Sequence, residues 1–176
     1  MARLMHRLIL MRHAQAEPSA AGGDAARVLS TAGRHEADLM GRALAERGLK
    51  PDLALVSTAA RTRQTWDEMH DAFGDVEVRD LAPLYNASAD AIRRLVEASE
   101  EEAGCLLVLA HNPGVHVLAV EYLSESAASP AVLERLAGGF PTGAPPCLRT
   151  SASAGLGRSA GRARWPPPPA RGTPTG

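Results

Sequence analysis

Three short apolar runs in this chain each lead into a basic side chain, and this repeated pattern restricts the fold more than any other feature of the sequence. The runs, with the basic residues that follow them, are 8–11 with Arg12 and His13, 53–56 with Arg61, and 106–110 with His111. Apolar runs of this length that are bounded by polar residues are typical of buried strands. The sequence therefore predicts a sheet in which several strands deliver a positive or titratable group at their exits.

Helical patterns separate the predicted strands, which favours the α/β class. The expected strands cover 7–11, 53–56, 76–79 and 105–110. The expected helices are one capped by Ser30 or Thr31 and ended by Gly48 and Pro51, and others over 61–72, 88–102 and 115–123. This alternation indicates a three-layer sandwich, a mainly parallel sheet with helices on both faces. In such sheets ligands bind at the carboxyl ends of the strands, where the basic groups would converge.

Two arginines and two histidines at one rim would suit a phosphoryl group. The planar donors of Arg12 and Arg61 match phosphate oxygens and stay protonated. A neutral histidine can attack phosphorus and form a covalent intermediate, while a second imidazole donates a hydrogen bond to the phosphoryl group. We expect no cofactor and no metal. The pattern lacks the carboxylates of a magnesium phosphatase, and the spacing of His111 and His116 is not that of a helical zinc pair.

Five segments carry these residues in a fixed order: 10–14 (LMRHA), 29–34 (LSTAGR), 56–65 (VSTAARTRQT), 84–87 (LYNA) and 110–113 (AHNP). In this order they resemble the histidine phosphatase superfamily, and most of all its small SixA-type phosphohistidine phosphatases. The resemblance covers about residues 7–140. It implies a phosphoglycerate mutase-like α/β fold.

The resemblance also implies roles for individual residues. His13 would be the nucleophile that becomes phosphorylated, Arg12 and Arg61 would bind the phosphoryl group, and His111 would complete the pocket. Larger members of the family place a glutamate general acid after the third strand. Here the corresponding region carries Asn86, which we expect to bind substrate or phosphate but which cannot donate a proton as a carboxylic acid does. The general acid is therefore unassigned.

The missing acid favours a substrate whose leaving group is easily protonated. The imidazole of histidine has a pKa of about 6.5, far below that of an alkoxide. We therefore expect a metal-independent phosphatase that acts through a covalent phosphohistidine intermediate, with a protein phosphohistidine as its substrate. Two alternatives remain open, a phosphatase for small phosphomonoesters and a non-catalytic module that binds phosphate or a phosphoprotein.

Charge and hydropathy exclude other classes of partner. The formal net charge is −1, and no basic stripe with interleaved aromatic residues is present, so we expect no nucleic-acid partner. The longest apolar runs are far shorter than the ~20 residues of a membrane span, and the first residues do not resemble a signal peptide. We expect a cytoplasmic protein without a membrane partner.

The last part of the chain differs in composition from the rest. From residue 141 onward it holds eight of the 13 prolines, several glycines and arginines, and no acidic residue. Such a segment buries little apolar surface, so we divide the chain into a phosphatase domain at 1–140 and an irregular tail at 141–176. We further expect the sheet to lack the final strand that the resemblance implies. A frame-shifted end and a natural proline-rich tail are both compatible with this composition.

Overall fold

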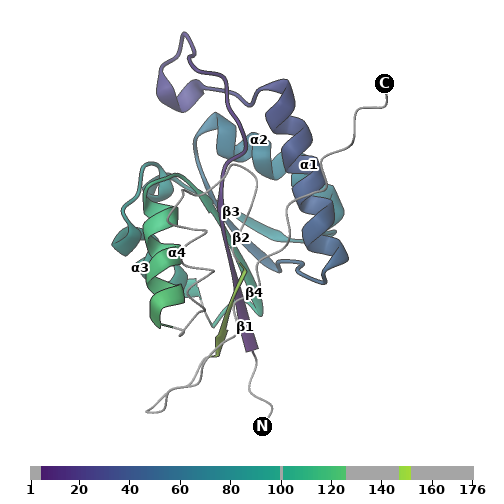
Figure 1. Ribbon diagram of the computed structural model, residues 1–176, viewed down its shortest axis with the longest axis vertical. Coiled ribbons are helices and arrows are strands. Elements are labelled where there is room, and N and C mark those ends of the chain that lie inside the picture. The colour runs from purple at the N-terminus through teal and green to yellow at the C-terminus, as the bar shows by residue number, and fades with distance from the viewer. Residues whose placement is uncertain (1–4, 100, 126–146, 152–176) are drawn as a thin grey trace.

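The computed structural model describes residues 5–99, 101–125 and 147–151, which form a sheet between two pairs of helices (Figure 1). In chain order the elements are β1 Met5–Arg12, η1 Asp24–Ala26, α1 Thr31–Glu46, β2 Leu53–Ser57, α2 Ala60–Met69, η2 His70–Ala72, β3 Glu77–Leu81, η3 Ala82–Leu84, α3 Ala89–Ser99, β4 Cys105–Ala110, α4 Gly114–Glu125 and β5 Cys147–Ser151. The strand order is β3-β2-β4-β1-β5. The neighbours among β1 to β4 pair in parallel, which confirms the predicted α/β sandwich.

Local signals in the sequence set the helix boundaries. The Ser30 hydroxyl accepts a hydrogen bond from the Gly33 amide at 3.1 Å and so caps α1, as predicted. Gly48 follows this helix with a φ of 68°, the left-handed conformation common just after a helix. Helix α3 ends at Ser99 rather than at the predicted Glu102. The Glu102 amide bonds instead to the Ser99 carbonyl, in the turn that leads into β4.

The central strands are buried on both faces, which explains their continuous apolar sequences. Alternate side chains, such as Leu8 and Val108, face the layer of α3 and α4. The side chains between them, such as Ile9 and Leu107, face α1 and α2. Figure 1 shows these two helix pairs on opposite sides of the sheet. Packing on both faces holds the strand exits in place at the upper edge.

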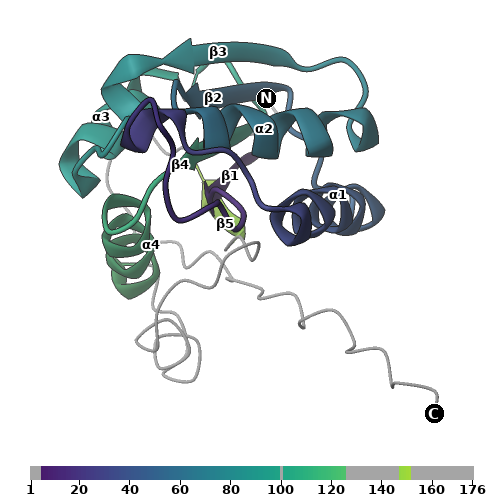
Figure 2. The same cartoon turned by 90° about the horizontal axis from the view of Figure 1, so that it is seen from above.

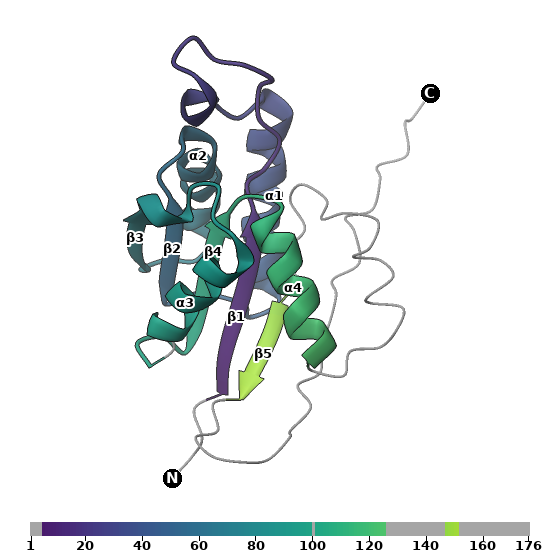
Figure 3. The same cartoon turned by 90° about the vertical axis from the view of Figure 1, so that its left-hand side faces the viewer.

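The prediction that the sheet lacks a final strand is wrong. Residues Cys147–Ser151 form β5, which pairs antiparallel with β1 from Ile9↔Cys147 to Met5↔Ser151 (Figure 3). Composition averaged over the tail hid this segment, because 147–151 contains neither proline nor glycine. The outer edge of β1 also offers unpaired amide and carbonyl groups that any extended segment can satisfy. The strand therefore depends on backbone pairing, which composition does not report.

The predicted domain boundary at residue 140 and most of the tail, residues 126–146 and 152–176, lie outside the described residues. The division into 1–140 and 141–176 therefore stays a prediction, except that β5 lies beyond that boundary and belongs to the sheet. Among the residues that the structure describes, no helix is both long and apolar enough to cross a membrane.

Two glycines allow helices to approach the loops that carry the site. A Cβ atom at Gly33 in α1 would collide with the backbone carbonyl of Gln15, just after β1. A Cβ atom at Gly114, the first residue of α4, would collide with the carbonyl of Ala87. Neither obstacle is a flexible side chain, so only glycine fits at these positions.

We predict that Gly33→Ala lowers the free energy of unfolding by about 2 kcal/mol, because overpacking against the Gln15 backbone outweighs the better helix propensity of alanine. Urea denaturation followed by circular dichroism measures this difference. Thr31→Ala, at an exposed position in the same helical turn, is the matched control and should change the value by less than about 0.5 kcal/mol. A Gly33→Ala protein as stable as the original would contradict the close approach.

Candidate active site

The strand exits meet at the carboxyl edge of the sheet, as the parallel topology requires. Figure 2 looks down on this edge and shows the segment between β1 and α1 lying across it beside α2. Arg12 is the last residue of β1 and lies opposite Ala110 of β4, so His13 and His111 follow two neighbouring strands. The imidazole rings of His13 and His111 lie with their centroids 5.4 Å apart.

The hydrogen bonds of His13 define which ring nitrogen is available for reaction. Nδ1 lies 2.7 Å from the Ala14 carbonyl, which can only accept, so Nδ1 carries the proton. Nε2 lies 3.2 Å from Nε of Arg61, which can only donate. The lone pair of Nε2 therefore faces the buried cation, which is the orientation that a histidine nucleophile requires.

The second imidazole is fixed in the opposite tautomer. His111 Nδ1 accepts from NH2 of Arg61 at 3.3 Å, so its proton is on Nε2. That Nε2 atom lies 2.7 Å from the hydroxyl of Ser57, the last residue of β2. Ser57 is fully buried, and it thus holds the His111 ring in one orientation.

Both imidazoles are neutral near pH 7. Burial is the main cause that lowers the pKa of His13 to about 4, with smaller contributions from the nearby guanidinium groups of Arg61, Arg12 and Arg27. Burial likewise lowers the pKa of His111 to about 3, and the charge of Arg61 acts in the same direction. The neutral form of histidine is the form that can act as a nucleophile.

Two guanidinium groups supply positive charge at this edge. Arg61 lies in the first turn of α2, and its side chain is only 4% exposed. Burial, and then the charge of Arg61, lowers the pKa of Arg12 below its usual value. The Nε atom of Arg12 is buried and has no hydrogen-bond partner among the described residues. An anion with several acceptor oxygens would satisfy both groups.

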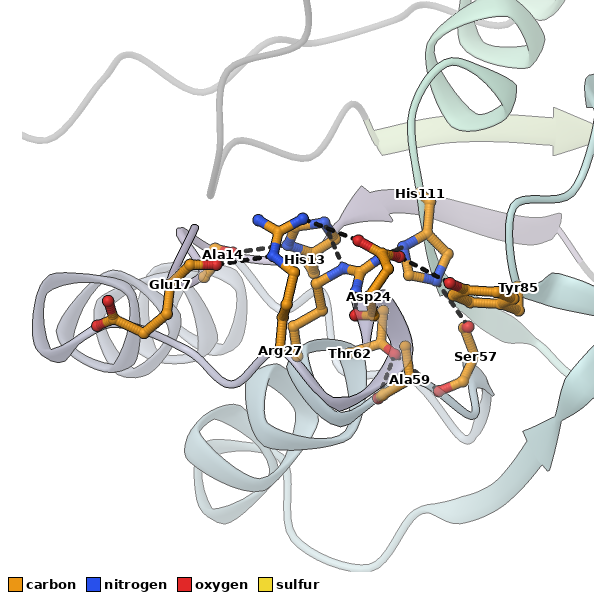
Figure 4. Close-up of polar contacts among 11 residues, drawn as sticks. His13, Ala14, Glu17, Asp24, Arg27, Ser57, Ala59, Thr62, Tyr85 and His111 are labelled. Carbon is orange, nitrogen blue, oxygen red and sulfur yellow. Dashed lines mark hydrogen bonds and ion pairs between the residues drawn. The ribbon is translucent and has the colours of Figure 1, made fainter. Parts of the chain in front are cut away.

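Asp24 was missed by the sequence analysis, yet it makes more contacts in the site than most of the predicted residues. Its Oδ2 atom accepts hydrogen bonds from NH2 of Arg61 at 3.0 Å and from the Tyr85 hydroxyl at 2.7 Å. Its Oδ1 atom accepts from Arg27 at 3.0 Å (Figure 4). These bonds, that from Tyr85 first among them, hold the pKa of Asp24 well below its usual range. Asp24 is thus ionised at any working pH.

The structure does not bring every predicted residue into this cluster. Asn86 is exposed, with a φ of 51°, and the hydrogen bond that joins its turn to the cluster comes from the neighbouring Tyr85. The Tyr85 ring also meets the His111 ring edge to face, with centroids 5.4 Å apart. Arg63, which stands in the same sequence segment as Arg61, points to Asp80 of β3 in a half-exposed ion pair of 3.1 Å.

The missed residues left weak signals in the sequence. Asp24 is the one acidic residue between Glu17 and Glu36, in a loop of small residues directly after the Arg-His pair. Tyr85 stands beside Asn86 in the segment 84–87, and Ser57 stands inside the segment 56–65 that carries Arg61. None of these signals specifies a partner, because each contact joins residues that are far apart in the chain.

A neutral, oriented histidine beside a buried arginine, at the carboxyl edge of a parallel sheet, defines a phosphatase of the histidine-dependent class. The family model "Histidine phosphatase superfamily (branch 1)" matches residues 8–101. The chain belongs to this superfamily and is a histidine-dependent phosphatase.

Relatives and solved structures support this membership. The uncharacterized protein Rv1276c of Mycobacterium tuberculosis is 33% identical over 141 residues, which is 80% of this chain and 87% of the relative. The candidate phosphohistidine phosphatase SixA from Agrobacterium tumefaciens has 32% identity and a TM-score of 0.74, covering 82% of this chain and 91% of that one. A protein histidine phosphatase SixA complexed with tungstate has 25% identity and a TM-score of 0.69, covering 90% and 94%.

We predict that Arg61→Met raises the pKa of both His13 and His111 by about 1 pH unit, because it removes a buried positive charge that disfavours the imidazolium forms. NMR titration of the histidine ring carbons measures these values. Arg63→Met, on the same helix but half-exposed and paired with Asp80, is the matched control and should leave both titrations unchanged. An unchanged His111 titration in Arg61→Met would contradict the geometry.

Proposed function

We propose that this protein is a metal-independent phosphatase that acts through a covalent phosphohistidine intermediate on His13, and that its substrate is a phosphohistidine carried by another protein. The observation that carries the proposal is the fixed tautomer of His13. Its Nδ1 proton is held by the Ala14 carbonyl, and its unprotonated Nε2 faces the arginine that would bind the phosphoryl group.

In the first step, the Nε2 lone pair of His13 attacks phosphorus, and the bond from phosphorus to the substrate's leaving atom breaks. The electron pair of that bond goes to the leaving group. Because the same lone pair accepts a hydrogen bond from Arg61 in the unliganded protein, Arg61 must turn from His13 to the phosphoryl oxygens as the substrate binds. Arg12 would hold the other oxygens and balance the developing charge.

In the second step, water attacks the phosphorus of phosphorylated His13. The P–N bond breaks, its electron pair returns to Nε2, and the water proton leaves with the phosphate or through solvent. Throughout both steps the Nδ1–H bond to Ala14 keeps the ring in place. His111, held by Ser57, faces Arg61 through Nδ1. A phosphoryl dianion beside it would favour its protonation, after which Nδ1 could donate to an oxygen.

The arrangement of Asp24 supports a phosphohistidine as the substrate. Asp24 is a carboxyl group that contacts Arg61 in the described site, but its three hydrogen-bond donors keep it ionised, so it cannot supply a proton to the leaving group in this arrangement. An alkoxide leaving group requires such a proton. An imidazole leaving group is itself basic near neutral pH and carries its own proton, so it needs no acid from the protein.

The similar structures also support this choice. One SixA structure at 25% identity is that of a protein histidine phosphatase, and it carries tungstate, a tetrahedral oxyanion like phosphate. The structure from Agrobacterium tumefaciens is that of a candidate phosphohistidine phosphatase. The cytoplasmic location and the absence of a nucleic-acid partner stay predictions from the sequence.

We predict that His13→Ala reduces phosphate release from a phosphohistidine-bearing protein by about 10³-fold or more, in the presence of a metal chelator, because the nucleophile is lost. The wild-type protein should keep its turnover with the chelator and should acquire an acid-labile phosphoryl group on His13, which mass spectrometry under alkaline conditions detects. His35→Ala, an exposed histidine on α1, is the matched control and should behave as the wild type.

Binding of inorganic phosphate without turnover or labelling, in either protein, would favour a non-catalytic phosphate-binding module instead. Turnover that the chelator abolishes would contradict the metal-independent mechanism.

We predict a kcat/KM for a phosphohistidine protein that exceeds the value for an alkyl phosphomonoester by about 100-fold or more, because general acid catalysis that the ester needs is worth at least about that factor. Parallel phosphate-release assays at pH 7 measure the ratio. Equal kcat/KM values for both substrates would contradict the leaving-group argument and would favour a phosphatase for small phosphomonoesters.

A further inference from the structure

We propose that Asp24 competes with the phosphoryl group of the substrate for Arg61. Asp24 binds Arg61 when no ligand is present and must move away from Arg61 when a phosphoryl group binds. Asp24 therefore sets how tightly the site binds every phosphorylated ligand. The inference rests on the proposed function for the role of Arg61. It adds a residue that tunes affinity, on a loop that no sequence pattern connects with the site.

The hydrogen bonds of Arg61 show the competition directly. Its NH1 atom donates to the Asp24 backbone carbonyl at 2.6 Å, and its NH2 atom donates to the Asp24 carboxylate at 3.0 Å. Two oxygens of one residue thus bind the outer edge of the guanidinium, as two phosphoryl oxygens would. Its remaining hydrogen bonds go to His13 and His111. A phosphoryl group can therefore bind Arg61 through both NH1 and NH2 only if Asp24 moves away.

The loop between β1 and α1, which carries Asp24, is built so that its tip can move away from Arg61 while its base stays in place. At the base, Ala16 and Leu29 form an antiparallel bridge, and the Glu17 amide donates to the Val28 carbonyl at 2.8 Å. At the tip, Asp24 follows Gly23, whose φ is 86° and whose surroundings leave room for movement. Among the described residues, Asp24 accepts the hydrogen bonds that join the tip to Arg61 and Tyr85.

A second hydrogen bond keeps Asp24 at the site. The Tyr85 hydroxyl donates to Asp24 Oδ2 at 2.7 Å from the opposite side of the cluster (Figure 4). The Asp24 side chain is 48% exposed, so water can replace its partners when it leaves, whereas Arg61 is 4% exposed and needs an anion beside it in either state. Asp24 is therefore the counter-ion of Arg61 when no substrate is bound.

The free energy of displacing Asp24 is the same for every ligand that binds through its phosphoryl group. It therefore weakens the binding of inorganic phosphate, of small phosphomonoesters and of phosphoproteins by one common factor. Inorganic phosphate has no other contacts to offset this factor, so it binds weakly and leaves readily after the reaction. A phosphoprotein brings contacts beyond the phosphoryl group, so it still binds at working concentrations.

The test is the equilibrium binding of inorganic phosphate to the full chain, measured by calorimetry at pH 7 and 150 mM salt. Asp24→Asn keeps the shape of the side chain but removes its charge, and we expect it to lower the Kd for phosphate by about two- to fivefold, the upper part of the range for one partly exposed ion pair. Tyr85→Phe removes the hydroxyl that retains Asp24, and we expect a smaller decrease in the same direction.

Glu17→Gln is the matched control, because it removes one negative charge from the same loop, and Figure 4 shows the Glu17 carboxyl group pointing away from the cluster. We expect this variant to change the Kd by less than about twofold. Unchanged or weaker phosphate binding in Asp24→Asn would overturn the proposal, and so would a Glu17→Gln effect as large as that of Asp24→Asn.

Because displacement of Asp24 affects all phosphorylated ligands by the same factor, the KM of a substrate is an independent test. In Asp24→Asn the KM for phenyl phosphate should fall by the same factor as the Kd for phosphate, and a KM that rises while phosphate binding tightens would overturn the proposal. Absence of turnover in every variant would count against the proposed function alone, because the phosphate titration requires no chemistry and would still decide the role of Asp24.

Discussion

The whole site depends on the hydrogen bonds that the buried guanidinium of Arg61 donates. This group donates hydrogen bonds to His13 and Asp24, both in the segment between β1 and α1, and to His111, which follows β4. A buried cation without acceptors would be very costly, so the fold supplies neutral imidazoles and a carboxylate around it. The same cation then suits a phosphoryl group, which offers it oxygen acceptors and negative charge.

The two histidines, which look alike in sequence, differ because of their hydrogen bonds. The Ala14 carbonyl, which can only accept, leaves the lone pair of His13 on Nε2, whereas NH2 of Arg61, which can only donate, requires that of His111 on Nδ1. Burial keeps both rings neutral, which lowers the cost of placing them beside two arginines. The two rings thus present different nitrogens to Arg61, Nε2 of His13 and Nδ1 of His111.

Much of the fold followed from sequence patterns because the central strands are buried on both faces. Strand β4 has the predicted bounds, and α1 begins where Ser30 can cap it. Strand β5 was missed because an edge strand needs only backbone partners, and its five residues lie in a segment whose overall composition predicts irregular structure. The end of α3 at Ser99 also differs from the prediction, because the turn that leads into β4 determines where this helix ends.

The sequence by itself determined which side chains lie at the strand exits, because period and burial fix the strands, and the exits carry Arg12, His13 and His111 with Arg61 in the next helix. The tertiary structure alone decided the tautomers, the neutral state of the imidazoles, and the contacts of Asp24 and Tyr85. The physical reason is that these properties depend on burial and on contacts across tens of residues, such as that between Tyr85 and Asp24. No local pattern encodes such contacts, because they exist only once the sheet has brought the exits together.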